Sequence, residues 1–344
     1  MIRTRILACA AVVAASFACA PPSAAQQVIR LTLADQNSPT SWGAIHALQP
    51  WVKQVEEATG GRVKIDVYPS QTLAKGPDIF TAVKTGIVDI GWCFHGYWPD
   101  MTPLADVVTL PSLPFRTGEK GAEVLWRLYE KFPAIQKEFA AVKPLMLWTS
   151  APYFLLTAKK QVKTLEDLKG LKIRVAGGPP TEQIKALGAV PTLIPMPDNY
   201  QAMDKGLIDG MGAPWEATHG FRLYEVAKYY TMAPLSAVYF SMSMNKDKWD
   251  SLPKDVQDAI MSVSGLTGSR FWGRNFFDTA EQGVIERVKE GKYEMVRYEL
   301  PPAELARWTK AGGEPLWDDW VKRMAAKGHP EAREILAATL DLLK

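Results

Sequence analysis

The sequence predicts an α/β protein with two lobes and a cleft between them. Strand-like and helix-like segments alternate over residues 28–94 and again over residues 165–213, and this alternation is typical of α/β units. Further strand-like segments lie between the two units and after the second one. The chain is therefore expected to cross between its lobes several times, which favours a cleft over two separate domains on one linker.

The first unit opens with VIRLTLAD, whose alternating apolar residues predict a strand. Residues 41–61 carry apolar residues at helical spacing, and Gly60 and Gly61 end that helix. RVKIDVYP predicts a second strand. A short helix over residues 78–85 then leads to IVDIGWCF, whose continuous apolar run is typical of a strand inside a parallel sheet.

The middle of the chain joins the two units. Residues 99–115 contain four prolines and are expected to be extended. Helices are predicted over residues 119–130 and 133–140, followed by the strands PLMLWTS and YFLLTA. From Leu165 the second unit is predicted as a helical turn, strand, helix, strand, helix and strand, in the segments LEDLKG, LKIRV, PTEQIKALG, VPTLI, DNYQAMDKG and IDGMG.

Two later strands, YYTMAP and AVYFSMSMN, are expected to cross back toward the first lobe. Pro253 suits the first position of a long helical stretch, which glycines at 265, 268 and 273 are expected to bend, and amphipathic helices end the chain. We expect a first lobe of residues 26–148 plus about 236–270. The second lobe, with the C-terminal helices, is expected to hold residues 149–235 plus about 271–344.

Residues 1–25 have the pattern of a secretory signal peptide, with arginines, an apolar run and small residues before Gln26. An N-terminal membrane anchor is the first alternative, and it is disfavoured because the apolar run is shorter than the ~20 residues needed to span a bilayer. A lipid anchor at Cys19 is the second alternative, and it is disfavoured because Ser16 stands where such anchors usually have leucine. We expect cleavage after Ala25 and a periplasmic product.

The chain without this segment has little net charge. Loss of Arg3 and Arg5 changes the net charge from +3 to +1, which gives no electrostatic reason to bind nucleic acid or an anionic membrane. Cys93 is then the single cysteine, so we expect no internal disulfide.

Sequence patterns of catalysis do not occur. The four histidines are not at metal-ligand spacing, and the chain has no GxSxG, GxGxxG or GxxxxGKS segment. We therefore expect a binding protein with no catalysis, no cofactor and no metal. An exported enzyme is the alternative, and it would need a nucleophile or an acid–base pair beside the binding site.

Four segments, in order along the chain, carry a family resemblance: YPSQTLAKGPDIFTAVKTGIVDIG, LPSLPF, the stretch from KTLEDLKGLKIRVAGG to IDGMGAPWEA, and MNKDKWDSLPKDVQDAI. Together they resemble the DctP-type substrate-binding proteins of TRAP transporters. The resemblance implies a two-lobed periplasmic binding protein fold with hinge strands and a long helix that spans the lobes. It also implies a small organic acid enclosed by lobe closure, and delivery to the small and large membrane subunits of a permease.

Arg174 is one residue from the end of the strand LKIRV. Ligands of open α/β sheets bind outside the carboxyl ends of the strands, and a guanidinium group meets a carboxylate with two parallel hydrogen bonds. By resemblance, Arg174 is the clamp for a ligand carboxylate. The alternative is that Arg174 pairs with an acid on the surface.

The same resemblance brings mostly apolar residues to the cleft. Many members have a second arginine where this chain has, at or beside that place, Phe154. Other cleft positions carry large apolar side chains: Trp92, Phe94, Met196, Trp215 and Trp42. We expect a monocarboxylate with an apolar, aromatic or branched body. The alternatives are that these side chains only pack the lobes, and that the ligand is a C4-dicarboxylate or a 2-oxo acid.

Three further positions belong to this predicted site. Asp35 lies in the first strand–helix loop, Tyr200 is expected to approach the ligand, and Gly177 leaves room and exposes backbone amides. A cation at Asp35, as in some relatives that bind oxo acids, is an alternative to the metal-free site. An extracellular sensor module is the alternative to transport, and we expect a monomer.

Overall fold

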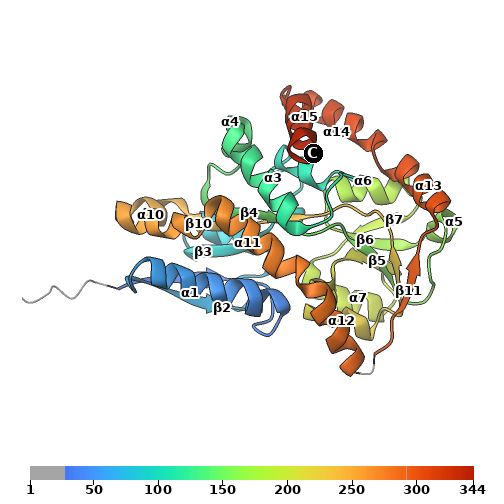
Figure 1. Ribbon diagram of the computed structural model, residues 1–344, viewed down its shortest axis with the longest axis horizontal. Coiled ribbons are helices and arrows are strands. Elements are labelled where there is room, and N and C mark those ends of the chain that lie inside the picture. Colours follow the sequence, from blue (N-terminus) through green and yellow to red (C-terminus); the bar gives the residue numbers. More distant parts are fainter. Residues whose placement is uncertain (1–27, 292) are drawn as a thin grey trace, which may run out of the picture.

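The computed structural model describes residues 28–291 and 293–344. The predicted signal peptide and its cleavage site lie outside these residues. Two mixed β-sheets, each covered by helices, form two lobes that lie side by side (Figure 1). The predicted α/β fold with two lobes is confirmed.

The first lobe is built on a sheet with the strand order β2-β1-β3-β10-β4. β1 pairs in parallel with β2 and β3, whereas β10 runs antiparallel to β3 and β4. The strands are β1 (Ile29–Ala34), β2 (Val63–Tyr68), β3 (Ile90–Phe94), β4 (Val142–Thr149) and β10 (Tyr239–Asn245). Its helices include α1 (Gln49–Ala58), α2 (Ile79–Lys84), α3 (Gly118–Lys131), α4 (Pro133–Glu138) and α9 (Lys246–Asp250).

The second lobe is built on a sheet with the strand order β11-β9-β5-β8-β6-β7. β6 lies parallel to β7 and β8, and β5 lies antiparallel to β8 and β9. The strands are β5 (Phe154–Thr157), β6 (Lys172–Val175), β7 (Val190–Leu193), β8 (Gly210–Ala213), β9 (Tyr229–Met232) and β11 (Val296–Glu299). Its helices are α5 (Leu165–Leu168), α6 (Pro179–Ala186), α7 (Asn199–Asp204) and α8 (Trp215–Gly220).

A segmented helical passage joins the lobes, as predicted from the glycines. It consists of α10 (Lys254–Ser262), α11 (Gly265–Trp272), a π-helical stretch (Gly273–Asp278) and α12 (Ala280–Glu290), and Figure 1 shows it in orange, running from the first lobe at the left to the second lobe at the right. At Gly273 a Cβ would lie 2.4 Å from the carbonyl oxygen of Gly118. Only glycine therefore lets the passage approach α3 this closely.

Asp278 fixes the same crossing point. Its carboxylate oxygens accept hydrogen bonds from the backbone N–H groups of Gly118 (2.6 Å) and Glu119 (2.9 Å), at the start of α3. The first N–H groups of a helix have no partner within the helix, so an acidic side chain there supplies a cap from a distant part of the chain.

The C-terminal helices are shared between the lobes, which differs from the sequence expectation for residues 271–344. α13 (Pro302–Gly312) contacts α5 and α6, whereas α15 (Ala332–Leu342) packs on α3. Trp320 of α14 (Pro315–Ala326) enters the same hydrophobic cluster as Leu104 and Leu113. Apolar side chains of α14 and α15 join this cluster because residues 99–115 present a matching apolar surface, while α14 also contacts α6 of the second lobe. Those residues include a buried 3-10 helix (Ala105–Thr109) rather than being extended throughout.

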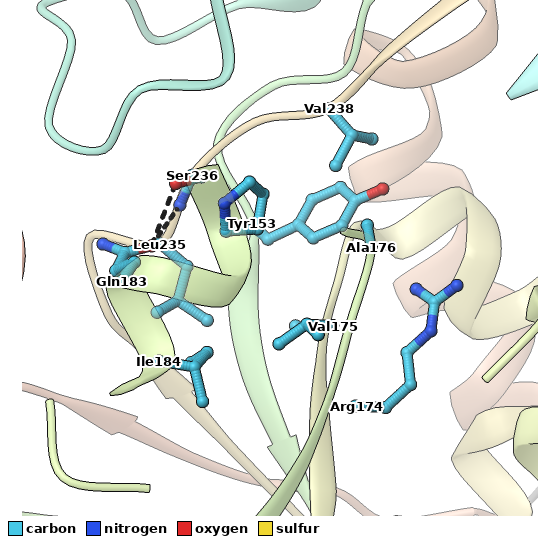
Figure 2. A pocket seen from close by; sticks show the side chains of 11 residues that line it. Tyr153, Arg174, Val175, Ala176, Gln183, Ile184, Leu235, Ser236 and Val238 are labelled. Carbon is cyan, nitrogen blue, oxygen red and sulfur yellow. Dashed lines mark hydrogen bonds between the residues drawn. The ribbon is translucent and has the colours of Figure 1, made fainter. Parts of the chain in front are cut away.

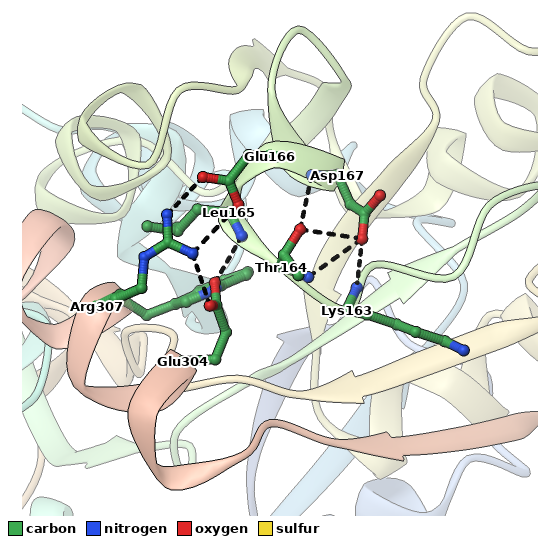
Figure 3. A network of polar contacts seen from close by, with 8 residues as sticks. Lys163, Thr164, Leu165, Glu166, Asp167, Glu304 and Arg307 are labelled. Atoms are coloured by element: carbon green, nitrogen blue, oxygen red, sulfur yellow. Dashed lines mark hydrogen bonds and ion pairs between the residues drawn. The ribbon is translucent and has the colours of Figure 1, made fainter.

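Polar contacts attach α13 to the loop before β6 (Figure 3). Glu304 Oε1 accepts hydrogen bonds from the backbone N–H of Leu165 (2.7 Å) and from Trp308 Nε1 (3.2 Å). Arg307 bridges Glu304 and Glu166. α5 is closed at its start by a capping box, and together these contacts hold the segment that leads into β6.

Replacing Asp278 tests this connection. We expect Asp278→Ala to lower the free energy of unfolding by about 1–2 kcal/mol, because two N–H groups of α3 lose their acceptor. Urea denaturation would measure the change. Asp258→Ala, at an exposed carboxylate of α10, is the control and should change stability by less than about 0.5 kcal/mol. Equal effects of the two substitutions would contradict the capping role.

Candidate functional site

A cavity with about 340 Å³ of free space lies between the lobes. Residues of β3, β6, β10, α8 and the π-helical stretch line it. Its apolar wall is aromatic: Trp92, Phe94, Phe221, Phe240, Phe276 and Phe277. Its polar lining is small and is contributed by Gln36, Asn37, Tyr153, Arg174 and Glu216. Such a cavity, mostly apolar with a few polar groups, is the usual form of a small-molecule site.

Arg174 of β6 is buried, with 3% of its surface exposed. Its Nε donates a hydrogen bond to the carbonyl oxygen of Ile194 (2.9 Å), and its Nη2 has no hydrogen-bond partner among the described residues. No acidic side chain forms an ion pair with Arg174 in the part of the chain that the structure describes. Burial lowers the pKa of Arg174, but guanidinium groups remain charged in proteins.

The aromatic side chains pack as a continuous wall. The ring of Phe240 lies 4.8 Å from that of Trp92, 5.1 Å from that of Phe94 and 5.3 Å from that of Phe277. Phe276 contacts both Trp92 (5.8 Å) and Phe277 (4.8 Å). These rings come from two strands of the first sheet and from the helical passage, so a flat apolar ligand would meet aromatic faces supplied by distant segments.

A second cavity, with about 320 Å³ of free space, shares Arg174 and Tyr153 with the first. Figure 2 shows Gln183 and Ser236 at the end opposite the guanidinium group of Arg174. Gln183 Oε1 accepts hydrogen bonds from the backbone N–H of Ser236 (2.8 Å) and from its hydroxyl group (3.0 Å), and Gln183 Nε2 donates to the carbonyl oxygen of Pro234 (2.8 Å). The polar groups of the Gln183 side chain are thus already satisfied.

The two lobes touch beside the first cavity. Tyr97 of the first lobe donates a hydrogen bond to Gln36 Oε1 (2.8 Å) and accepts one from the backbone N–H of Met196 (2.9 Å), which belongs to the second lobe. Nearby the contact is between main chains. A Cβ on Gly96 would lie 2.2 Å from the carbonyl oxygen of Ala176, and a Cβ on Gly177 would lie 2.5 Å from that of Gly96.

The buried acid Glu216 lines this cavity, and the buried acid Asp35 lies near Glu216. Burial raises the pKa of Glu216 to about 8; the hydrogen bond from the backbone N–H of Gly43 opposes this shift, and the nearby Asp35 contributes to it. Burial also raises the pKa of Asp35 to about 7, although Asp35 Oδ1 accepts hydrogen bonds from the backbone N–H (3.0 Å) and the side chain (2.8 Å) of Asn37. At neutral pH Glu216 is therefore mainly protonated.

Among residues 28–291 and 293–344, no group of three or more His, Cys, Asp or Glu side chains is arranged to hold a metal ion. In the same residues, no helix combines the length and the apolar character needed to cross a membrane.

A family model described as bacterial extracellular solute-binding protein, family 7 (DctP) matches residues 34–323. The chain belongs to this family. Its members include the solute-binding proteins of TRAP transporters, so the resemblance seen in the sequence is confirmed.

Three relatives show the extent of the sequence and structural similarity between this chain and known proteins. It is 28% identical to the outer membrane transporter protein TsaT of Comamonas testosteroni, over 88% of this chain and 87% of the relative. It is 27% identical to a TRAP solute-binding protein of Rhodoferax ferrireducens T118 in complex with benzoate, with a TM-score of 0.86 and coverage of 92% and 98%. It is also 27% identical to a marine metagenome TRAP solute-binding protein specific for aromatic acid ligands, in complex with 3-hydroxybenzoate, with a TM-score of 0.86 and coverage of 92% of this chain and 98% of that one.

In this DctP-family chain, four residues expected at the site from sequence come together. Arg174, Phe94, Trp92 and Met196 all line the first cavity. The alternative that Arg174 pairs with a surface acid disagrees with its burial and with the absence of such an ion pair among the described residues.

Phe154 and Trp215, which were also expected at the site, do not line this cavity. Their rings lie 4.8 Å apart and pack with Tyr230 inside the second lobe. In both cases the adjacent residue, Tyr153 or Glu216, lines the cavity instead. Successive residues of a strand point to opposite faces, and successive residues of a helix are rotated by about 100°, so an error of one position selects the wrong face.

Four other residues expected at the site do not line the cavity. Tyr200 donates a hydrogen bond to Glu225 (3.0 Å), and Trp42 donates one to Thr279 (3.0 Å). Asp35 is buried behind Asn37, and Gly177 lies at the contact between the lobes.

Sequence reasoning also missed residues that do line it: Tyr153, Glu216, Phe240, Phe276 and Phe277. A signal existed for the first two, which flank the positions chosen. The three phenylalanines are far from Trp92 in the sequence, and no local pattern connects them with it.

The main-chain contact between the lobes can be tested at Gly177. Gly177 and Gly188 both have positive φ angles, +72° and +88°, but a Cβ on Gly188 would have nothing within 4 Å. Both Gly177→Ala and Gly188→Ala should cost about 1–2 kcal/mol of stability because of the left-handed backbone. Only Gly177→Ala should also weaken binding of the aromatic acids discussed below, by tenfold or more, as measured by calorimetry. Equal affinities of the two variants would contradict a role of the contact in closure.

The protonated state of Glu216 predicts a pH dependence of stability. A carboxyl group whose pKa rises from 4.5 unfolded to about 8 folded holds its proton in the folded state, so stability falls between those pH values. Glu216→Gln should remove this loss. Its free energy of unfolding, relative to the unsubstituted protein, should therefore rise by the order of 1–3 kcal/mol from pH 5 to pH 8. Glu57→Gln, at an exposed carboxylate, should show no such trend; a flat difference for Glu216→Gln would show that this carboxyl is ionised.

Proposed function

We propose that this protein is the periplasmic solute-binding subunit of a TRAP transporter and that it captures an aromatic monocarboxylate. The observation that carries the proposal is the buried guanidinium of Arg174, whose Nη2 has no partner and which lines a cavity with an aromatic wall. Arg174 clamps the carboxylate, and the rings of Trp92, Phe94 and Phe240 contact the apolar body. The relatives in complex with benzoate and 3-hydroxybenzoate support this ligand class.

The physical case for a monocarboxylate rests on the number of cations in the cavity. Arg174 is the single Lys, Arg or His side chain among the described residues that line it. A second carboxylate would be buried without a cation, which costs several kcal/mol. Aromatic side chains favour a ring through burial of apolar surface and offset stacking.

The protein acts without catalysis in this proposal. Closure of the lobes removes the ligand from water, and the closed protein delivers it to the membrane subunits of the permease. The signal pattern of residues 1–25 and the extracellular character of the family support a periplasmic location, and we propose that the protein acts as a monomer.

A thermal-shift screen tests the ligand class. Benzoate at a hundredfold excess over its dissociation constant should stabilise the protein by about 2.7 kcal/mol, and succinate and glucuronate should have no effect at the same concentration. If only succinate or glucuronate raised the melting temperature, the proposal of an aromatic monocarboxylate would be wrong.

Substitution of Arg174 tests the clamp. Arg174→Ala should weaken benzoate binding by about 2–5 kcal/mol, since the ligand carboxylate would be buried without its partner. The ligand-free variant should be at least as stable as the unsubstituted protein, because an unpaired buried charge is removed. Arg62→Ala, at an arginine on the surface of the first lobe, is the control for affinity. Unchanged binding by Arg174→Ala would remove this residue from the site.

A further inference from the structure

We propose that Glu216 is a specificity-determining residue that selects ligands carrying a hydroxyl group on the aromatic body, away from the carboxylate. The inference deepens the proposed function and rests on it, since Arg174 must hold the carboxylate. Its basis is the set of hydrogen-bonding groups that the cavity leaves unpaired.

Three buried side-chain atoms of the residues that line this cavity have no hydrogen-bond partner in the described chain. They are Nη2 of Arg174, Nε1 of Trp92 and Oε1 of Glu216. The nitrogen atoms can only donate a hydrogen bond. Glu216 is the one of the three that can accept a hydrogen bond, and a ligand whose only polar group is the carboxylate held by Arg174 would leave it without a partner.

Glu216 is well held for this role. It lies in the first turn of α8 and has 3% of its surface exposed. A Cβ added to Gly220 would lie 3.4 Å from Glu216 Oε1, so this oxygen lies beside the following turn of its own helix. Burial of an unsatisfied polar group is unfavourable, and a ligand hydroxyl that enters the cavity would relieve this cost.

Glu216 and Arg174 are not hydrogen-bonded or ion-paired to each other. No ion pair joins them among the described residues, and neither is among the groups that shift the pKa of the other. The two groups are therefore separate anchor points on one cavity, and a ligand that reaches both needs a body between its two polar ends. A ring with a carboxylate and a hydroxyl group has this form.

Two other polar residues of this cavity already have partners: Gln36 Oε1 accepts the hydrogen bond of Tyr97, and Asn37 Nδ2 donates to Asp35. Tyr153, which also lines the cavity, interacts electrostatically with both Arg174 and Glu216. The raised pKa of Glu216 favours a neutral hydroxyl group over an ammonium group as its partner, because the carboxyl is mainly protonated at neutral pH. A protonated carboxyl both donates and accepts, as a hydroxyl group does.

Calorimetric titration with benzoate, 3-hydroxybenzoate and 4-hydroxybenzoate tests the inference. In the unsubstituted protein at least one hydroxybenzoate should bind about tenfold more tightly than benzoate, the value of one buried hydrogen bond. Glu216→Leu should abolish this preference and still bind benzoate. Glu216→Gln, which keeps a neutral hydrogen-bonding group, should retain most of it.

Glu138→Gln is the matched control. Glu138 is also a buried carboxyl, whose pKa burial raises to about 7, but it accepts hydrogen bonds from the backbone N–H groups of Leu104 and Ala105, and it does not line the cavity. This variant should keep the preference of the unsubstituted protein. If Glu216→Leu does not fold, Glu216→Ala serves the same comparison.

The outcomes separate the two proposals. Tight binding of benzoate with an unchanged hydroxybenzoate preference in Glu216→Leu overturns the role of Glu216 and leaves the proposed function intact. The same holds if the unsubstituted protein binds benzoate as tightly as both hydroxybenzoates. Binding of none of the three acids by the unsubstituted protein overturns the proposed function, and this inference with it.

Discussion

The organisation of this molecule depends on one constraint: the charged guanidinium group of Arg174 is buried away from water and has no anion beside it among the described residues. Removing such a charge from water is costly, and the fold keeps Arg174 in this state by tying Nε to a backbone carbonyl of the neighbouring segment. The strand β6 fixes its direction, and the capped α5 and the docked α13 hold the segment before that strand. An anion that binds here pairs this buried charge, so the free energy that the unpaired guanidinium group costs the ligand-free protein contributes to the affinity for the anion.

The remaining charges near the cavity are arranged so that an anion is not repelled. Asp35 and Glu216 are two buried acids beside the cavity, and burial favours the protonated form of both. Tyr97 and Tyr153 have pKa values raised by burial, so their hydroxyl groups are neutral. The local field is thus dominated by Arg174, although the chain as a whole is close to neutral.

Local sequence patterns predicted most elements of the fold because each pattern depends on residues close together in the chain. The strand LKIRV, the two helices after residue 117 and the glycine-interrupted passage are of this kind. The residues of the site were harder to predict than the elements of the fold. Arg174 was placed at the cleft because its strand is recognisable, whereas Phe154 and Trp215 were each one position from the residue that lines the cavity. The wall formed by Phe276 and Phe277 depends on how the passage crosses between the lobes, and the placement of α14 and α15 depends on an apolar surface far away in the sequence.

The contact between Gly96 and Gly177 has a consequence for ligand size. Two side chains that meet can change rotamer and accommodate a slightly larger cargo, but two main chains cannot. The backbone therefore limits how closely the lobes can approach at this point, and this limit is a property of the polypeptide rather than of the bound molecule. An acid longer than the gap left between the lobes would keep the lobes partly open. A permease that accepts only the closed form of the protein would then reject this ligand by its length, without contacting it.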